Sequence, residues 1–127
     1  MAVDYAKVHV KAVCSKNSDY SLPVAVMAPE AYTLTPDEYL HMELNCDTGG
    51  EIIKTDRFDG GVTLCIVKNN DTAIVVTAQF DTAGDANVDV AIPAGGIFVT
   101  PDFAYAGDLT LTSASGTPEC EVFIIGT

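Results

Sequence analysis

The sequence contains no tryptophan, only two histidines and few basic residues. Six lysines and arginines stand against 18 aspartates and glutamates, which gives a formal net charge of −12 at pH 7. Such a charge repels nucleic-acid phosphates and anionic lipid headgroups, so we expect no nucleic acid and no membrane surface among the partners. An acidic surface of this kind favours solubility.

The sequence also lacks long hydrophobic runs. No run approaches the roughly 20 apolar residues that a membrane-spanning helix needs. The first residues do not form the apolar core of a signal peptide either, because Asp4, Lys7, His9 and Lys11 interrupt them. We therefore expect a chain that is made in a cytoplasm without a signal peptide.

The common catalytic motifs are missing as well. There is no GxSxG elbow, no HExxH pair and no phosphate-binding glycine loop. His9 and His41 are the only imidazole bases, and both stand at polar positions of strand-like patterns, where a solvated histidine is the expected role. The sequence thus predicts no catalytic residue, no cofactor-binding residue and no enzyme.

The four cysteines, at positions 14, 46, 65 and 120, are far apart and form no CxxC pair. Each lies within a strand-like run. We expect reduced thiols that pack in the core, in preference to a disulfide or a metal site.

Short apolar runs separated by turn residues dominate what is present. The clearest stretch is Val88–Pro101, in which Val88, Val90 and Ile92 alternate with Asp89 and Ala91 before Pro93 ends the run. Ala94-Gly95-Gly96 then supplies a turn, and a second apolar run begins at Ile97. This pattern predicts a hairpin or a tight corner between two strands.

The same pattern of short apolar runs separated by turn residues recurs along the chain. It predicts eight to ten short strands in one domain of residues 1–127. We expect an all-β fold, an antiparallel β-sandwich of the jelly-roll or Greek-key kind. The turn Asn69–Thr72 predicts a hairpin between the strands on either side of it, and the last strand, apolar on both faces from Val122 to Ile125, is expected at a central or covered position. The expected strands are Val3–Cys14, Leu22–Ala28, His41–Cys46, Glu51–Lys54, Val62–Lys68, Ala73–Phe80, Val88–Ile92, Ile97–Val99, Leu109–Ser113 and Cys120–Ile125.

One segment carries a helix signal. Thr35, Pro36 and Glu38 have the spacing of an N-cap, a first helical position and a capping-box glutamate. The alternation of Met42, Leu44 and Cys46 with polar residues follows at once. We therefore expect one short helix or helical turn near residues 36–41, followed by a strand.

Two binding hypotheses remain from single residues. Asp81 and the alternating oxygens of Asp85, Asn87 and Asp89 resemble part of a calcium loop, but a solvated acidic loop is the preferred interpretation, because Val90 stands where the glycine of such a loop belongs. The tyrosines could form a contact surface or pack against the sheet; they are Tyr5, Tyr20, Tyr32, Tyr39 and Tyr105. Neither pattern contains a complete ligand set, so we expect no metal site.

The second half of the chain resembles small virion proteins of tailed bacteriophages. The resemblance lies in the segments LCIVKNNDTAIVVTAQF, VDVAIPAGGIFVTP and DLTLTSASGTPECEVFIIGT. It implies a small β-sandwich, commonly a trimer, that decorates or cements a capsid.

From this resemblance we expect a capsid decoration protein in the virion, bound to the major capsid protein at capsomer junctions and assembled as a homo-oligomer, with a trimer favoured. The alternative is a tail, fibre or surface module that recognises a host glycan or another virion protein.

Overall fold

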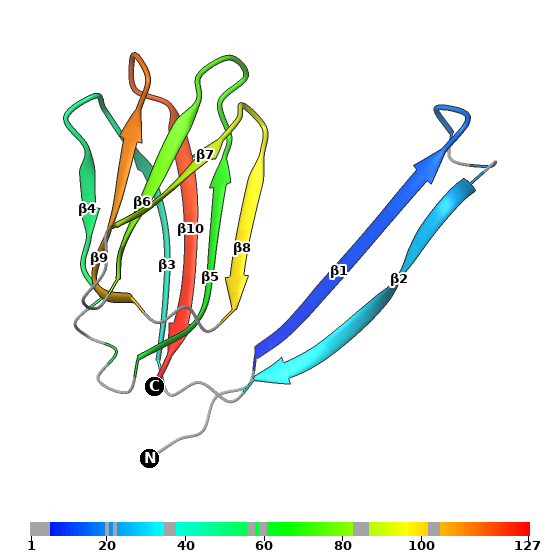
Figure 1. The fold of residues 1–127 in the computed structure, drawn as a ribbon, viewed down its shortest axis with the longest axis horizontal. Helices are drawn as coiled ribbons and strands as arrows, with labels where there is room; N and C mark the ends of the chain where they lie inside the picture. Colours follow the sequence, from blue (N-terminus) through cyan, green and yellow to red (C-terminus); the bar gives the residue numbers. More distant parts are fainter. Residues whose placement is uncertain are drawn as a thin grey trace. The chain divides into compact units, whose positions relative to one another are not determined.

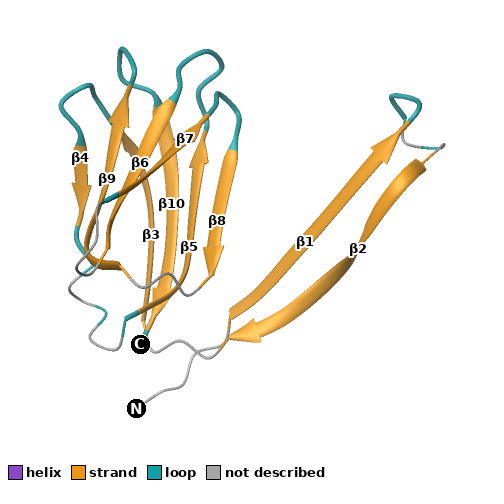
Figure 2. Ribbon diagram, viewed as in Figure 1, coloured by secondary structure: helices purple, strands orange, loops and turns teal. Residues whose placement is uncertain are grey.

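The computed structural model describes residues 6–19, 21, 23–34, 38–55, 58, 61–82, 87–101 and 105–127. Contacts within the chain divide it into two units, Met1–Pro36 and Asp37–Thr127. All elements in the described part of the chain are strands (Figures 1 and 2), and none of these residues forms a helix that could cross a membrane. The prediction that residues 1–127 form one domain stays a prediction.

The first unit is a long antiparallel hairpin of β1 (Ala6–Ser15) and β2 (Pro23–Leu34). The backbone register runs from Ala6 opposite Leu34 to Ser15 opposite Pro23, with irregularities beside Ala12 and Ser15. Side-chain hydrogen bonds order the turn, since Asn17 Nδ2 donates to Ser21 Oγ and Ser21 N donates to Asp19. The strands are 10 and 12 residues long, so β2 continues well beyond the expected end at Ala28.

The second unit is a sandwich of two four-stranded antiparallel sheets, as the sequence predicts at the level of an all-β sandwich (Figure 1). One sheet has the order β3-β10-β5-β8 and the other β4-β9-β6-β7. The strand bounds are β3 (Glu38–Asn45), β4 (Glu51–Ile53), β5 (Val62–Asn69), β6 (Val76–Thr82), β7 (Val88–Ile92), β8 (Ile97–Pro101), β9 (Tyr105–Ser113) and β10 (Glu119–Gly126).

Most sequence neighbours among these strands lie in different sheets. Only β6 and β7 are consecutive strands that pair with each other. The hairpin predicted across Asn69–Thr72 is therefore wrong, because β5 pairs with β10 and β8 while β6 belongs to the other sheet. Of the two forms expected around Pro93–Gly96, the corner is the one present. A turn sequence reverses the chain in both cases, and burial of the apolar faces decides which strand becomes the neighbour.

The short helix expected near residues 36–41 is not present in the described residues. Glu38 already begins β3, and residues 35–37 lie outside the described ranges. The capping signal is local, whereas the alternation of Leu40, Met42 and Leu44 is satisfied by pairing along β10 and by packing against the core. Tertiary burial overrides the local helix preference here.

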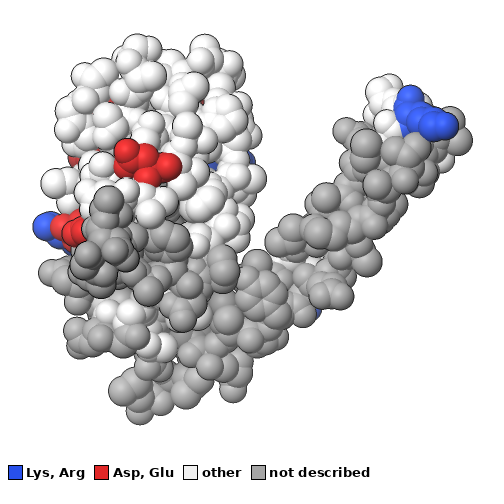
Figure 3. Space-filling view, in the orientation of Figure 1, with Lys and Arg blue, Asp and Glu red and all other residues white. Residues whose placement is uncertain are grey.

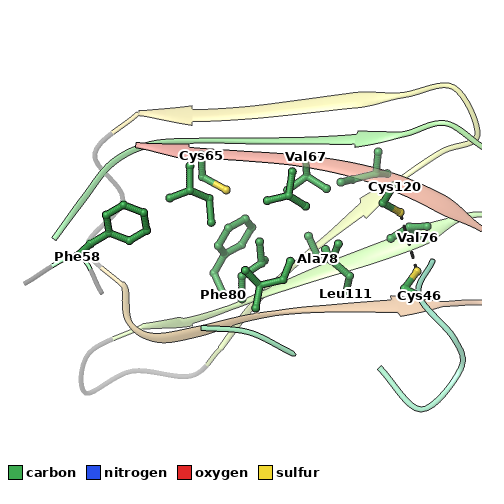
Figure 4. Packing of buried hydrophobic residues seen from close by; sticks show 14 residues of the cluster. Cys46, Phe58, Cys65, Val67, Val76, Ala78, Phe80, Leu111 and Cys120 are labelled. Atoms are coloured by element: carbon green, nitrogen blue, oxygen red, sulfur yellow. Dashed lines mark hydrogen bonds between the residues drawn. The ribbon is translucent and has the colours of Figure 1, made fainter. Parts of the chain in front are cut away.

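The core fills the space between the two sheets (Figure 4). Cys65 and Val67 from β5 and Ile124 from β10 meet Phe80 from β6 and Leu111 from β9, and all five are almost fully buried. The central place of β10, between β3 and β5, confirms the expectation for the last strand. Phe58 packs at the end of this core, where Gly126 has no room for a Cβ atom.

The side chain of Asn69 links two corner connections of the sandwich by hydrogen bonds. Its side chain is fully buried, and Nδ2 lies 2.8 Å from the carbonyl oxygen of Ile74, 3.1 Å from that of Ile92 and 3.2 Å from that of Pro93. Its Oδ1 accepts a hydrogen bond from Asp71 N. One amide thus holds the β5–β6 and β7–β8 connections at the same end of the molecule.

Candidate interaction surface

The outer side of the β3-β10-β5-β8 sheet follows from its register. Leu40, Met42 and Leu44 of β3 pack on the core, so the residues between them face outward. Across the sheet, His41 lies opposite Phe123, Phe123 opposite Ile66, and Ile66 opposite Val99. One cross-strand row of this outer side is therefore apolar apart from the histidine.

Several of these outward side chains are open to solvent. Tyr39 is 60% exposed, Ile97 is 61% exposed and Val99 is 37% exposed, while Phe123 and Ile66 are half-buried. We call these residues, together with His41, the apolar patch. Leu64 and Ile125 share the register row of Tyr39, are almost completely buried, and are not counted in it.

A ring contact and a contact between imidazole and carboxylate order one side of the apolar patch. The rings of His41 and Phe123 meet edge to face with centroids 5.9 Å apart, and His41 Nε2 lies 3.3 Å from Glu121 Oε2. In the next row Glu43, Glu121 and Lys68 lie side by side, and Lys68 lies opposite Ile97 of the apolar patch. Charged groups thus border the apolar patch at this end, as they do at the rim of many protein interfaces.

The outer side of the other sheet is different in kind. Thr77 lies between Thr112 and Ala91, and Gln79 lies between Thr110 and Asp89. Gln79 Nε2 donates a 3.0 Å hydrogen bond to Asp89. Ile52, 59% exposed on the edge strand β4, is the large apolar exception. The two broad faces of the sandwich therefore have opposite character.

The residues singled out from the sequence are distributed over the molecule and are not gathered at one site. His9 is exposed on β1, and His41 belongs to the apolar patch. Of the tyrosines, Tyr39 lies on the apolar patch, and the side chains of the other four lie outside the described residues. The sequence pattern did not predict the ring contact between His41 and Phe123. This contact follows only once β3 and β10 are known to be neighbours.

The structure does not test the calcium hypothesis, because the proposed ligand Asp85 lies outside the described residues. Asp81 and Asp89 are exposed, Asn87 is exposed at the start of β7, and residues 83–86 lie outside the described ranges. Asp89 faces outward on a strand and is engaged with Gln79. Among the described residues, no group of three His, Cys, Asp or Glu side chains is placed to hold a metal ion.

Two cysteines face each other inside the sandwich. Cys46 and Cys120 are fully buried free thiols with sulfur atoms 4.0 Å apart, joined by the dashed line in Figure 4. Burial raises the pKa of Cys46 and raises the pKa of Cys120 to about 12. Cys65 is buried as well, and the Cys14 side chain lies outside the described residues.

Exposed carboxylates are shifted in the other direction by hydrogen bonds. Backbone N–H groups of Ala73 and Ile74 donate to Asp71 and lower its pKa. A hydrogen bond from Lys54, at 2.7 Å, lowers the pKa of Asp108. The Asp71 hydrogen bonds fix a corner, and the contact between Lys54 and Asp108 joins the end of β4 to β9.

No protein-family model, curated protein or solved structure matches this chain. The physical character of the surface is therefore the main guide to function. Acidic side chains are visible on the sandwich in Figure 3, and exposed Lys16 stands in the turn of the hairpin. Exposed apolar patches of this kind occur at protein, membrane and ligand contact sites.

Proposed function

We propose that this chain is a structural protein of a bacteriophage virion, a capsid decoration or cement protein that binds the head shell at capsomer junctions. Its partner would be the major capsid protein, and it would act as a homo-oligomer, with a trimer favoured. The proposed role is mechanical and uses no cofactor. The resemblance of the second half of the chain to small virion proteins supports it.

The strand order also supports this proposal. The strand orders β3-β10-β5-β8 and β4-β9-β6-β7, with one within-sheet connection, favour a jelly roll over another Greek-key sandwich. We therefore propose that the sandwich is a jelly roll. This architecture is used by viral capsid domains and also by lectins, so it suits the decoration role and the glycan-binding alternative alike.

The contrast between the two outer faces is the observation that carries the proposal. An isolated acidic domain gains nothing from leaving Ile97, Val99 and Tyr39 exposed on one sheet. In the proposed homo-oligomer the same side chains would be covered by a second copy, with a gain of roughly 25 cal/mol for each Å² of apolar surface removed from water. Binding only to the assembled shell then stabilises the shell by mass action.

The experiment measures binding to expanded shells assembled from the major capsid protein encoded in the same genome. We expect the native protein to cosediment with these shells and to raise their melting temperature. Ile97→Asp should weaken binding at least tenfold, because a dissociated chain loses the simultaneous contacts that an oligomer makes with the shell. Ile52→Asp is the matched control, because Ile52 is equally exposed on an edge strand of the other sheet.

Two outcomes would overturn the decoration role. One is an absence of shell binding by the native protein; the other is equal loss of binding in the Ile97 and Ile52 variants. If shells are not bound and a glycan array gives hits that Tyr39→Ala abolishes, the alternative of a tail, fibre or surface module takes its place.

A further inference from the structure

We infer that the β1–β2 hairpin is an arm that packs on the apolar patch of a second copy of this chain. The inference rests on the proposed homo-oligomer and assigns the contacts that would build it. Four properties of the hairpin and the sandwich support it: strand number, strand length, apolar pattern and charge.

Strand number shows that the hairpin needs a partner. Within the described residues, β1 and β2 hydrogen-bond only to each other and form a sheet of two strands. A two-stranded sheet is at best marginally stable in water, and packing against another apolar surface is what stabilises it. A covering surface is therefore required for this element.

Strand length makes one copy of the sandwich too small for the hairpin. Strands β1 and β2 have 10 and 12 residues, whereas β3, β5 and β10 each have 8 and β8 has 5. At roughly 3.3 Å per residue, β2 spans about 40 Å and the sheet that carries the apolar patch about 27 Å. The hairpin is thus longer than this face of one sandwich, which leaves part of it to pack on another copy.

The sequence pattern of the hairpin matches an apolar acceptor. In β1, Val8, Val10 and Ala12 alternate with Lys7, His9 and Lys11. Successive residues of a strand lie on opposite sides, so this pattern predicts one apolar and one basic side. Lys7 and His9 are exposed, as the basic side requires. The apolar side suits the patch around Ile97 and Phe123.

The distribution of charge along the chain favours the hairpin, rather than a second sandwich, as the element that covers the apolar patch. Residues 1–36 contain three acidic and three basic residues, whereas residues 37–127 contain fifteen acidic and three basic ones. Two sandwiches placed face to face would bring two strongly negative bodies together. The unit of residues 1–36 carries no formal net charge, so its hairpin meets less repulsion at the apolar patch than a second sandwich would.

A contact of this kind is compatible with a closed assembly. The donor surface is the hairpin and the acceptor surface is the apolar patch, so the contact joins two different surfaces of identical chains. Repeated contacts of this kind close into a ring when the rotation allows it, as the proposed trimer requires.

The test places the photoreactive residue p-benzoylphenylalanine at Ile97 or, as the control, at Ile52 in the full-length protein. Equal amounts of ¹⁴N and ¹⁵N chains are unfolded and refolded together, irradiated and digested. We expect position 97 to capture peptides from residues 6–34 of a differently labelled chain, and position 52 to capture at least tenfold less. Native mass spectrometry should show an oligomer that Ile97→Asp dissociates.

Capture of residues 6–34 only within chains of the same label would show that the hairpin packs on its own sandwich and would overturn the inference. Capture of other segments, or a monomeric native mass, would overturn it as well. The test uses no shell, so a crosslinked oligomer that fails to bind shells refutes only the decoration role. A shell-binding monomer without such crosslinks refutes only the arm.

Discussion

Asn69 shows how one residue can fix the end of the sandwich. Its side-chain amide reaches carbonyl oxygens in two connections, and its side chain is fully buried. From the sequence it is only a turn residue beside Asn70, because the segments that supply its acceptors are distant along the chain. Its importance depends on contacts that exist only after folding.

Replacing this residue should therefore be costly. We expect Asn69→Ala to lower the free energy of unfolding by roughly 2 kcal/mol, because buried carbonyl oxygens lose their donor. Asn70→Ala is the control, since Asn70 is exposed and bonds to Glu119 through its backbone. Urea unfolding of both variants checks this, and equal stabilities would contradict the role given to Asn69.

The buried thiol pair predicts a loss of stability at alkaline pH. The pKa of Cys120 is raised from 9.0 to about 12, so above pH 9 the unfolded chain releases a proton that the folded chain keeps. The free energy of unfolding should consequently fall as the pH rises from 9 toward 12. Cys120→Ala should show a shallower fall in urea titrations at several pH values. A slope unchanged by the substitution would mean that other groups cause it.

At the scale of elements, the corner between β7 and β8 contains two adjacent glycines that are required for different reasons. Gly95 has a φ of +72° and open space around its Cβ position, whereas a Cβ on Gly96 would lie 2.9 Å from the Pro93 carbonyl oxygen. The first position requires a left-handed backbone and the second requires space. Their roles in the β7–β8 connection therefore differ although they are adjacent.

Valine at either position should destabilise the protein by roughly 1–3 kcal/mol. Asparagine distinguishes the two causes, because it tolerates left-handed angles but still carries a Cβ atom. We expect Gly95→Asn to retain most of the stability and Gly96→Asn to lose as much as Gly96→Val. Melting temperatures measure this, and identical behaviour of the two asparagine variants would refute the distinction.

Strand positions were largely predictable, and strand partners were not. Alternation located β5, β7 and β10 to within about two residues of their observed limits. It could not show that β5 and β6 lie in different sheets, because a turn such as Asn69–Thr72 serves a hairpin and a corner equally well. The helix signal near Glu38 failed for a related reason, since pairing with β10 outweighed a local cap.

At the scale of the whole molecule, the negative charge disfavours association of two copies, whereas the apolar patch favours it. The sandwich unit contains most of the acidic residues, yet one of its faces carries the apolar patch. Association through this patch must overcome repulsion between negative bodies, and salt screens that repulsion with a Debye length of about 30 Å at 0.01 M and about 8 Å at 0.15 M.

We therefore expect the oligomer to strengthen as salt is added. The dissociation constant should fall several-fold between 0.01 and 0.15 M NaCl in sedimentation equilibrium, and Ile97→Asp should stay monomeric throughout. Weaker association at the higher salt concentration would show that attractive charge pairs, rather than apolar burial, hold the copies together.

The sequence by itself determined the class of fold, the positions of most strands and the acidic character of the chain, because alternation and charge are local properties of the residues. Tertiary structure alone decided that Pro93–Gly96 is a corner, that Asn69 joins two connections and that His41 meets Phe123. It also revealed that one outer face carries an apolar patch and that the other is mainly polar among the described residues. These features depend on which strands become neighbours, and burial of the whole core makes that choice.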